Sequence, residues 1–198
     1  MFGNLESIAR DWQYYLPALI IAFTIHEFSH AYVSYKLGDR GVKEDGRLSL
    51  NPAVHIDPLG LLFLFVTGFG WAKPVVIRPS YYRNPVRDTM LVALAGPVSN
   101  FILAALAIIL NMLFKETIFA FFFTYLWIIN IGLGIFNLIP VPPLDGSRIM
   151  SYFMDADDYQ DYLEKRWIGW ILLIMILTTG FMGHILNPIY TFLINFIY

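Results

Sequence analysis

The chain of 198 residues contains no cysteine and few charged residues. The lack of cysteine excludes disulfides, thiolate metal ligands and a cysteine nucleophile. Charged residues make up 14% of the sequence and hydrophobic residues 58%, whereas a soluble domain carries about 25% charged and about 45–50% apolar residues. This composition excludes a disordered chain and an ordinary soluble domain, so it predicts an integral membrane protein.

Basic charge is also scarce, since the formal net charge is −2. This balance gives no support for a nucleic-acid partner. The first residues show neither a basic leader nor a small-residue cleavage site, so we expect no removable signal peptide. No repeat or linker divides the sequence, which predicts a single membrane-embedded domain over residues 1–198.

Four stretches approach the roughly 20 apolar residues that a transmembrane helix needs. They cover residues 14–37, 89–114, 117–139 and 167–198. The last is too long for one helix across a bilayer core of about 30 Å. Gly180, Gly183 and Asn187-Pro188 predict its division into one span and a short returning helix. The expected fold is an all-α polytopic membrane protein with about four to five transmembrane helices.

Residues 47–77 lie between the first two spans, and their apolar run, residues 59–66, is far too short to cross the membrane as a helix. Their prolines, glycines and β-branched residues predict a small re-entrant or β element that dips into the membrane face. An interfacial hairpin without function is an equally open interpretation. The polar and glycine-rich residues 38–70 are the expected gate for water.

The basic residues predict the orientation in the membrane. Of the 13 lysines and arginines, 11 lie either between the first and second spans, counting Lys36 at the end of the first, or between the third and fourth. Basic loops remain in the cytoplasm, so these two connections are expected there and the N-terminus outside. The predicted location is the cell membrane, crossed several times.

The motif with the clearest chemistry is His26-Glu27-Phe28-Ser29-His30, which matches H-E-x-x-H inside the first span. Residues four apart lie on one face of a helix, so both imidazoles can bind one metal ion with Glu27 beside it. Ionisable residues inside a span are costly and face protein or water. A hydrogen-bonded polar seam between helices and a redox or transport metal site are the alternatives.

A catalytic zinc ion needs a third protein ligand. Asp145 is a candidate because it follows the third span and the proline-rich residues 140–143, although it could instead cap the next helix. His184 is expected on the opposite side of the membrane. The acidic residues of positions 155–161 are typical of a solvated surface.

Several motifs in the same order resemble the site-2 protease family of intramembrane zinc metalloproteases. Besides H-E-x-x-H they are residues 51–60 (NPAVHIDPLG), 70–75 (GWAKPV), 95–100 (AGPVSN) and 137–146 (NLIPVPPLDG). The resemblance covers about residues 18–148. It is to the short members of the family, because the chain has no room for a PDZ or CBS domain.

The resemblance implies a role for each matched residue. It identifies His26, His30 and Asp145 as ligands of one zinc ion per chain and Glu27 as the catalytic residue. Asn137 matches an asparagine that holds the substrate backbone. Asn100 matches an asparagine at the active site and is assigned to substrate binding with it. His55 matches a histidine of the short members, with a substrate contact and a loop-anchoring hydrogen bond as open alternatives.

These features predict a zinc-dependent intramembrane endopeptidase that cleaves transmembrane segments of membrane proteins. Its partners are then transmembrane substrates and the lipid bilayer, and its active site opens toward the cytoplasm. A metal-binding membrane transporter is the first alternative, but residues 16–25 contribute only Thr24 to a polar path toward the outer side. An inactive membrane scaffold is the second. The sequence leaves the oligomeric state and the identity of the substrate open.

Overall fold

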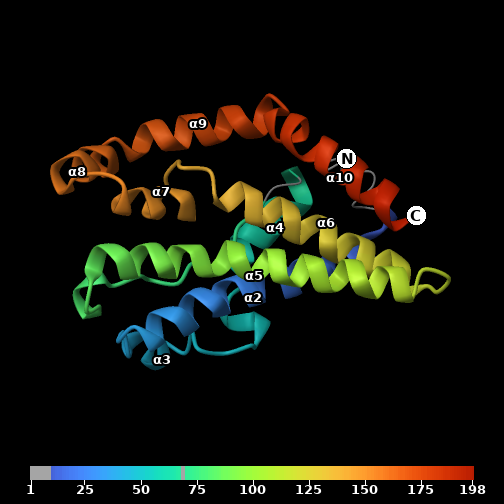
Figure 1. Cartoon of the computed structure of the whole chain (residues 1–198), viewed down its shortest axis with the longest axis horizontal. Helices are drawn as coiled ribbons and strands as arrows, with labels where there is room; N and C mark the ends of the chain where they lie inside the picture. Colours follow the sequence, from blue (N-terminus) through green and yellow to red (C-terminus); the bar gives the residue numbers. More distant parts are fainter. Residues whose placement is uncertain (1–9, 68–69) are drawn as a thin grey trace.

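The computed structural model describes residues 10–67 and 70–198, and every regular element within these ranges is helical. The helices long and apolar enough to cross a membrane are α2 (Trp12–Lys36), α5 (Pro85–Leu113) and α6 (Phe119–Asn137). They match the first three predicted spans. The bent pair formed by α9 and α10 adds a fourth if it crosses as one. The all-α polytopic fold is confirmed, at the lower end of the predicted number of spans (Figure 1).

Three helices form the core: α5 packs along both α2 and α6, and α2 also contacts α6 (Figure 1). Small residues line these contacts, because Ala18 and Ala22 of α2 and Ala104 and Ala107 of α5 are buried. Lipid gives no hydrophobic drive for helices to associate, so close packing through small residues stabilises such bundles. Trp127 of α6 fills the remaining space and is fully buried.

The fourth apolar stretch is broken at Gly180, as predicted. Helices α9 (Arg166–Thr178) and α10 (Phe181–Ile197) meet there at an angle of 54°, and Gly180 adopts a left-handed φ of 71° that favours glycine. Gly183 and Asn187-Pro188 lie inside α10 and do not interrupt it. The second helix was expected to be short and to return toward the side from which the span came. Instead, α10 has 17 residues and turns away from α9 by only 54°. In Figure 1, α9 runs along the outside of the bundle.

The connection between the first two spans contains α3 (Gly41–Glu44), α4 (Pro58–Thr67) and the 3-10 turns Pro52–Val54 and Pro79–Tyr81. The expected extended chain is therefore interrupted by a helix of 10 residues, which is too short to cross the membrane. Asp57 favours this helix, because its Oδ1 accepts hydrogen bonds from the amides of Leu59 (2.8 Å) and Gly60 (3.2 Å).

The re-entrant position of the connection between the first two spans stays a prediction. In the part of the chain that the structure describes, the only β contact is an isolated antiparallel bridge between Ile56 and Ala72. Gly68 and Phe69 of the expected gate lie outside the described residues, as do residues 1–9 with the predicted outer N-terminus.

A proline-rich reversal follows α6. Residues 138–144 lead into α7 (Asp145–Ile149), the 3-10 turn Met150–Tyr152 and α8 (Ala156–Glu164). A Cβ added to Gly146 would lie 2.4 Å from the carbonyl oxygens of both Leu138 and Ile139. Only glycine fits this close approach, which folds the start of α7 back onto the end of α6. The acidic side chains of α8 are exposed, as expected.

Candidate metal centre

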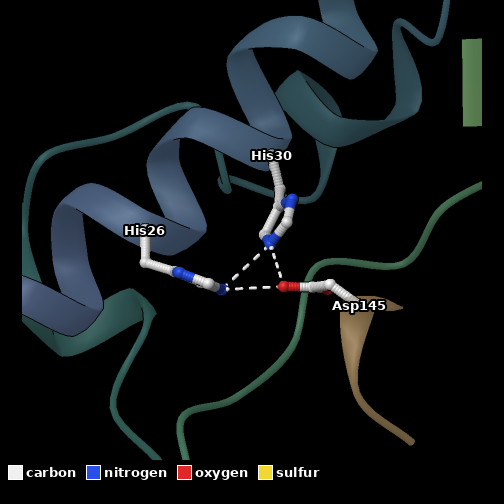
Figure 2. A group of neighbouring side chains, drawn as sticks. All are labelled: His26, His30 and Asp145. Atoms are coloured by element: carbon white, nitrogen blue, oxygen red, sulfur yellow. Dashed lines mark hydrogen bonds and ion pairs between the residues drawn. The ribbon is translucent and has the colours of Figure 1, made fainter. Parts of the chain in front are cut away.

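His26 and His30 lie one turn apart on α2, and both are buried. Their Nε2 atoms are 3.0 Å apart. The Oδ2 atom of Asp145 lies 3.1 Å from each of them, so three ligand atoms face one point (Figure 2). Among the residues that the structure describes, this is the only group of three His, Cys, Asp or Glu side chains close enough to hold a metal ion.

Asp145 reaches the histidines because it is the first residue of α7. The residue in the capping position is Leu144, so the capping alternative considered for Asp145 does not describe this structure. Burial alone would raise the pKa of Asp145, but the imidazoles of His30 and His26 outweigh it and hold that pKa well below its usual range. Asp145 is therefore a carboxylate, the form in which it can bind a metal.

In both histidines the ring nitrogen that points away from the ligand group, Nδ1, contacts the neighbouring helix α5. His30 Nδ1 lies 2.7 Å from the carbonyl oxygen of Val92 and His26 Nδ1 lies 2.6 Å from Oδ1 of Asn100. Both partners accept hydrogen bonds, so each Nδ1 donates, and Nε2 is the nitrogen of each imidazole that is left to bind a metal. Metal-binding histidines in proteins are oriented in this way.

Gly96 keeps the space beside the two imidazoles open. A Cβ at this position would lie 2.4 Å from His30 Nε2 and 2.7 Å from His26 Nε2. Both distances are far shorter than ordinary van der Waals contacts, so any larger residue would displace the histidines. The glycine of the AGPVSN motif is therefore a structural requirement of this centre.

The donor set fits zinc. Two imidazole nitrogens and one carboxylate oxygen are ligands that zinc accepts, and three protein ligands are typical of a catalytic site. Donors at about 2.0–2.2 Å from a tetrahedral zinc ion lie about 3.3–3.6 Å from one another. The observed separations of 3.0–3.1 Å are close to this spacing.

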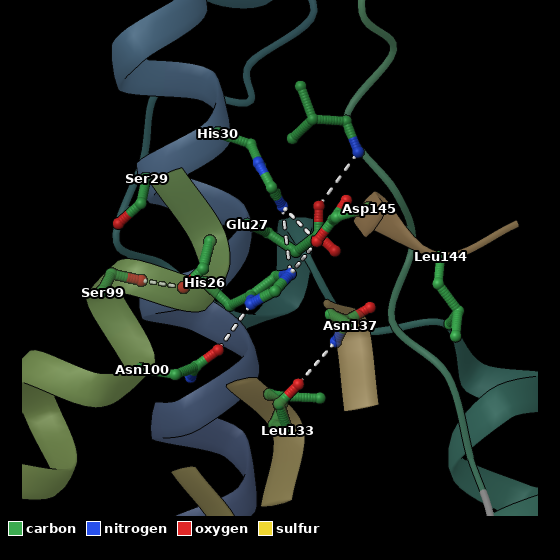
Figure 3. Close-up of polar contacts among 12 residues, drawn as sticks. His26, Glu27, Ser29, His30, Ser99, Asn100, Leu133, Asn137, Leu144 and Asp145 are labelled. Atoms are coloured by element: carbon green, nitrogen blue, oxygen red, sulfur yellow. Dashed lines mark hydrogen bonds and ion pairs between the residues drawn. The ribbon is translucent and has the colours of Figure 1, made fainter. Parts of the chain in front are cut away.

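Glu27 lies beside the three ligand atoms without being one of them (Figure 3). It is buried, and its Oε2 accepts a hydrogen bond of 3.0 Å from the backbone amide of Val75. The segment that carries Val75 is fixed in turn, because Arg47 donates to the carbonyl oxygens of Lys73 (3.2 Å) and Val54. The residues after Trp71 therefore bring a backbone donor to the carboxylate.

Asn137 and Asn100 lie on different sides of the centre. Asn137 is half-buried at the end of α6, and its Nδ2 donates to the Leu133 carbonyl oxygen at 3.0 Å (Figure 3). Its Oδ1 accepts no hydrogen bond from the described residues. Asn100 is fully buried behind His26, on the side of Nδ1, and this geometry favours a positioning role over a substrate contact.

The other two histidines lie apart from the metal-ligand group. His55 is fully buried and its Nε2 lies 2.7 Å from the Ser49 carbonyl oxygen. This contact corresponds to the loop-anchoring alternative, while its Nδ1 has no hydrogen-bond partner among the described residues. His184 is exposed on α10, with its Nδ1 3.3 Å from the Gly180 carbonyl oxygen.

Two groups that support the candidate metal centre could not be found by reading motifs. The first is the Val75 amide, because any residue except proline has a backbone donor and the residue type therefore does not indicate it. The second is Asn130 of α6, fully buried, whose Oδ1 accepts a hydrogen bond of 2.7 Å from Asn100 Nδ2. A polar residue within an apolar span was its only available signal.

Comparison with known proteins agrees with this geometry. Peptidase family M50 matches residues 111–179, which include Asn137 and Asp145. A Bacillus subtilis (strain 168) protein with the name "Putative zinc metalloprotease YwhC" is 39% identical over 186 residues, which cover 88% of this chain and 84% of that protein.

Two further relatives are more distant. A Mycolicibacterium smegmatis protein, "Putative zinc metalloprotease Rip2", is 28% identical over 81% of this chain and 64% of its own length. "Zinc metalloprotease MJ0392" of Methanocaldococcus jannaschii is 26% identical over 70% of this chain and 34% of its own length. No solved structure matches the chain.

Proposed function

The chain belongs to peptidase family M50, the site-2 protease family, and on this premise we propose that it is a zinc-dependent endopeptidase that cleaves transmembrane segments of membrane proteins. The observation that carries the proposal is the meeting of His26, His30 and Asp145 around one point, with Glu27 beside it. The names of the relatives support a zinc metalloprotease. The position of the histidines inside a candidate span supports cleavage within the membrane.

We assign zinc binding to Nε2 of His26, Nε2 of His30 and the Asp145 carboxylate. Zinc, when bound, supplies a Lewis acid that makes both water and the scissile carbonyl group more reactive. Glu27 is the general base: its carboxylate removes a proton from the attacking water and delivers it to the leaving amide nitrogen. The peptide bond then breaks into a carboxyl and an amine product.

A transmembrane substrate has to unwind locally, because a helix ties up each carbonyl group in a hydrogen bond to the residue four positions later. Backbone groups released in lipid need new partners. We assign this task to Asn137, whose Oδ1 is available to a substrate amide while its Nδ2 is held by Leu133. His55 is buried in its loop, so it supports the site from a distance.

The proposed place of action is the cell membrane, with the N-terminus outside and the site open to the cytoplasm. The bias of 11 of 13 basic residues toward two connections supports this orientation. The apolar exposed side chains of α9, including Trp170, Ile171 and Ile174, support contact with the bilayer.

The decisive experiment compares the chain with its Glu27→Gln variant in zinc content and in cleavage of a reporter transmembrane peptide. Glutamine keeps an oxygen for the Val75 amide but cannot act as a base. We expect one zinc ion per chain in both proteins and a loss of turnover of about 10²–10⁴-fold in the variant. Retained turnover would contradict the role of Glu27, and absence of zinc from the unaltered chain would contradict the metalloprotease assignment.

A further inference from the structure

A line of three polar side chains crosses the core of the bundle from α2 to α6. It begins at His26, whose Nδ1 lies 2.6 Å from Asn100 Oδ1, and continues from Asn100 Nδ2 to Asn130 Oδ1 at 2.7 Å. Asn130 Nδ2 donates to the carbonyl oxygen of Leu126 at 2.8 Å. Asn100 and Asn130 are fully buried, so both amides are shielded from bulk water.

The direction of these hydrogen bonds is fixed at the far end. The Leu126 carbonyl only accepts, so Asn130 turns its amino group toward it and its oxygen toward Asn100. Asn100 then turns its amino group toward Asn130 and the Ala22 carbonyl oxygen (3.4 Å), and its own oxygen toward His26. A rotated Asn100 amide would place two oxygen atoms against each other.

From this arrangement we infer that Asn130 is a positioning residue for the metal centre, acting on His26 through Asn100. With an oxygen facing it, Nδ1 of the His26 imidazole carries a hydrogen, so Nε2, which faces His30 and Asp145, is the nitrogen that can bind a metal. The opposite tautomer would direct a hydrogen atom at the metal position. The inference deepens the proposed function and rests on it for its consequence, but the hydrogen bonds from His26 to Asn130 exist without metal.

The first measurement reads the tautomer directly. Nitrogen-15 NMR of the histidine rings distinguishes the two neutral forms, and the chain has only four histidines. The measurement uses metal-free Asp145→Leu protein, because the Asp145 carboxylate 3.1 Å from His26 Nε2 would otherwise compete for the ring hydrogen. In this background we expect neutral His26, assigned by loss of its signals in His26→Ala, to be a single tautomer with hydrogen on Nδ1. When Asn130→Leu, which has nearly the same size but no acceptor, is added to this background, we expect a mixture of the two tautomers.

The second measurement is zinc affinity by competition with a chelator. Loss of a partner behind a metal-binding histidine typically weakens binding about 10–100-fold, and we expect this for Asn130→Leu. Asn130→Asp keeps an acceptor oxygen toward Asn100 and should retain the single tautomer and most of the affinity. If Asn130→Leu is not recovered folded, Asn130→Ala removes the same acceptor without a larger side chain.

The matched control is Asn111→Leu. Asn111 is also fully buried on α5, and it donates to the Ala120 carbonyl oxygen and to Thr124 Oγ1, both at 2.8 Å, away from the metal centre. A general effect of removing a buried amide would alter zinc affinity in both variants. An unchanged His26 tautomer in Asn130→Leu, or equal losses in Asn130→Leu and Asn130→Asp, would overturn the inference. A correct tautomer in a chain that binds no zinc would instead contradict the proposed function.

Discussion

Oε2 of Glu27 and the backbone nitrogen of Val75 are joined by a hydrogen bond of 3.0 Å, although 48 positions separate the two residues. One residue lies in the first span and the other in the connection that follows it. The proposed general base is thus oriented by backbone from outside its own helix. Such support from fixed neighbours is what holds a catalytic group in productive geometry.

The Val75 contact predicts a kinetic effect without loss of metal. Val75→Pro removes the amide hydrogen, so the Glu27 carboxylate loses its donor while the three ligands stay in place. We expect kcat to fall about tenfold or more with little change in KM or zinc content, as measured with a reporter peptide. Val76→Pro is the matched control, because the Val76 side chain is 57% exposed and its amide does not contact Glu27. Equal effects of the two prolines would indicate a general distortion of the segment.

Gly96 predicts a loss of metal binding from the addition of one methyl group. Gly96→Ala would place a carbon atom 2.4 Å from His30 Nε2, which forces the imidazole away from the centre. We expect zinc affinity to fall about 10–100-fold or more, together with activity. Gly183→Ala serves as the control, since its new Cβ would meet only Asn187 Nδ2 at 3.6 Å, an ordinary contact. A Gly96→Ala protein with full zinc content would show that the helices adjust without cost.

Asn137 distinguishes a substrate contact from a helix-end residue. If Asn137 contacts the substrate, the Asn137→Ala variant leaves a substrate amide without a partner. The transition state should then lose about 1–3 kcal/mol of stabilisation, measured as a lower kcat/KM, while the melting temperature and zinc content stay unchanged. As a residue that only satisfies the Leu133 carbonyl group, its loss should reduce stability by about 0.5–2 kcal/mol with normal cleavage per folded molecule. Thermal unfolding and cleavage measured on one preparation separate the outcomes.

The orientation in the membrane can be tested by labelling single cysteines, since the chain has none of its own. Glu44→Cys and Asp157→Cys, both at exposed positions, should react only with a reagent applied from the cytoplasmic side. Glu116→Cys, in the exposed connection between α5 and α6, should react only from the outside. Labelling of positions 44 and 157 from opposite sides would contradict the predicted topology.

The sequence predicted what depends on residue type and spacing. In a membrane protein, a long apolar run is by itself enough to locate a helix, so the sequence placed three spans within a few residues of their observed bounds. The spacing of His26 and His30 placed both on one face of α2, and the proline-rich segment indicated Asp145. Asp57 illustrates a weaker signal: its hydrogen bonds to Leu59 and Gly60 begin a helix in a segment expected to be extended.

What could not be predicted depends on contacts between distant parts of the chain. Gly96 is needed because α5 packs against the histidines of α2 at that residue. The sequence around Gly96 does not indicate which helix lies against it. The role of Asn130 depends on a second asparagine 30 positions earlier and on a histidine beyond it. Residues that act through another side chain are visible only once the helices are placed.

The proposed ligand set also implies an order of events during synthesis. His30 and Asp145 are separated by 115 positions, and two of the three core helices lie between them in the chain. Because a protein emerges from the ribosome with its N-terminal part first, the two histidines enter the membrane well before the carboxylate exists. A nascent chain that stops before α7 carries the proposed general base but lacks the third proposed ligand. Under the proposed function, the metal centre can therefore be completed only after α5 and α6 have been synthesised.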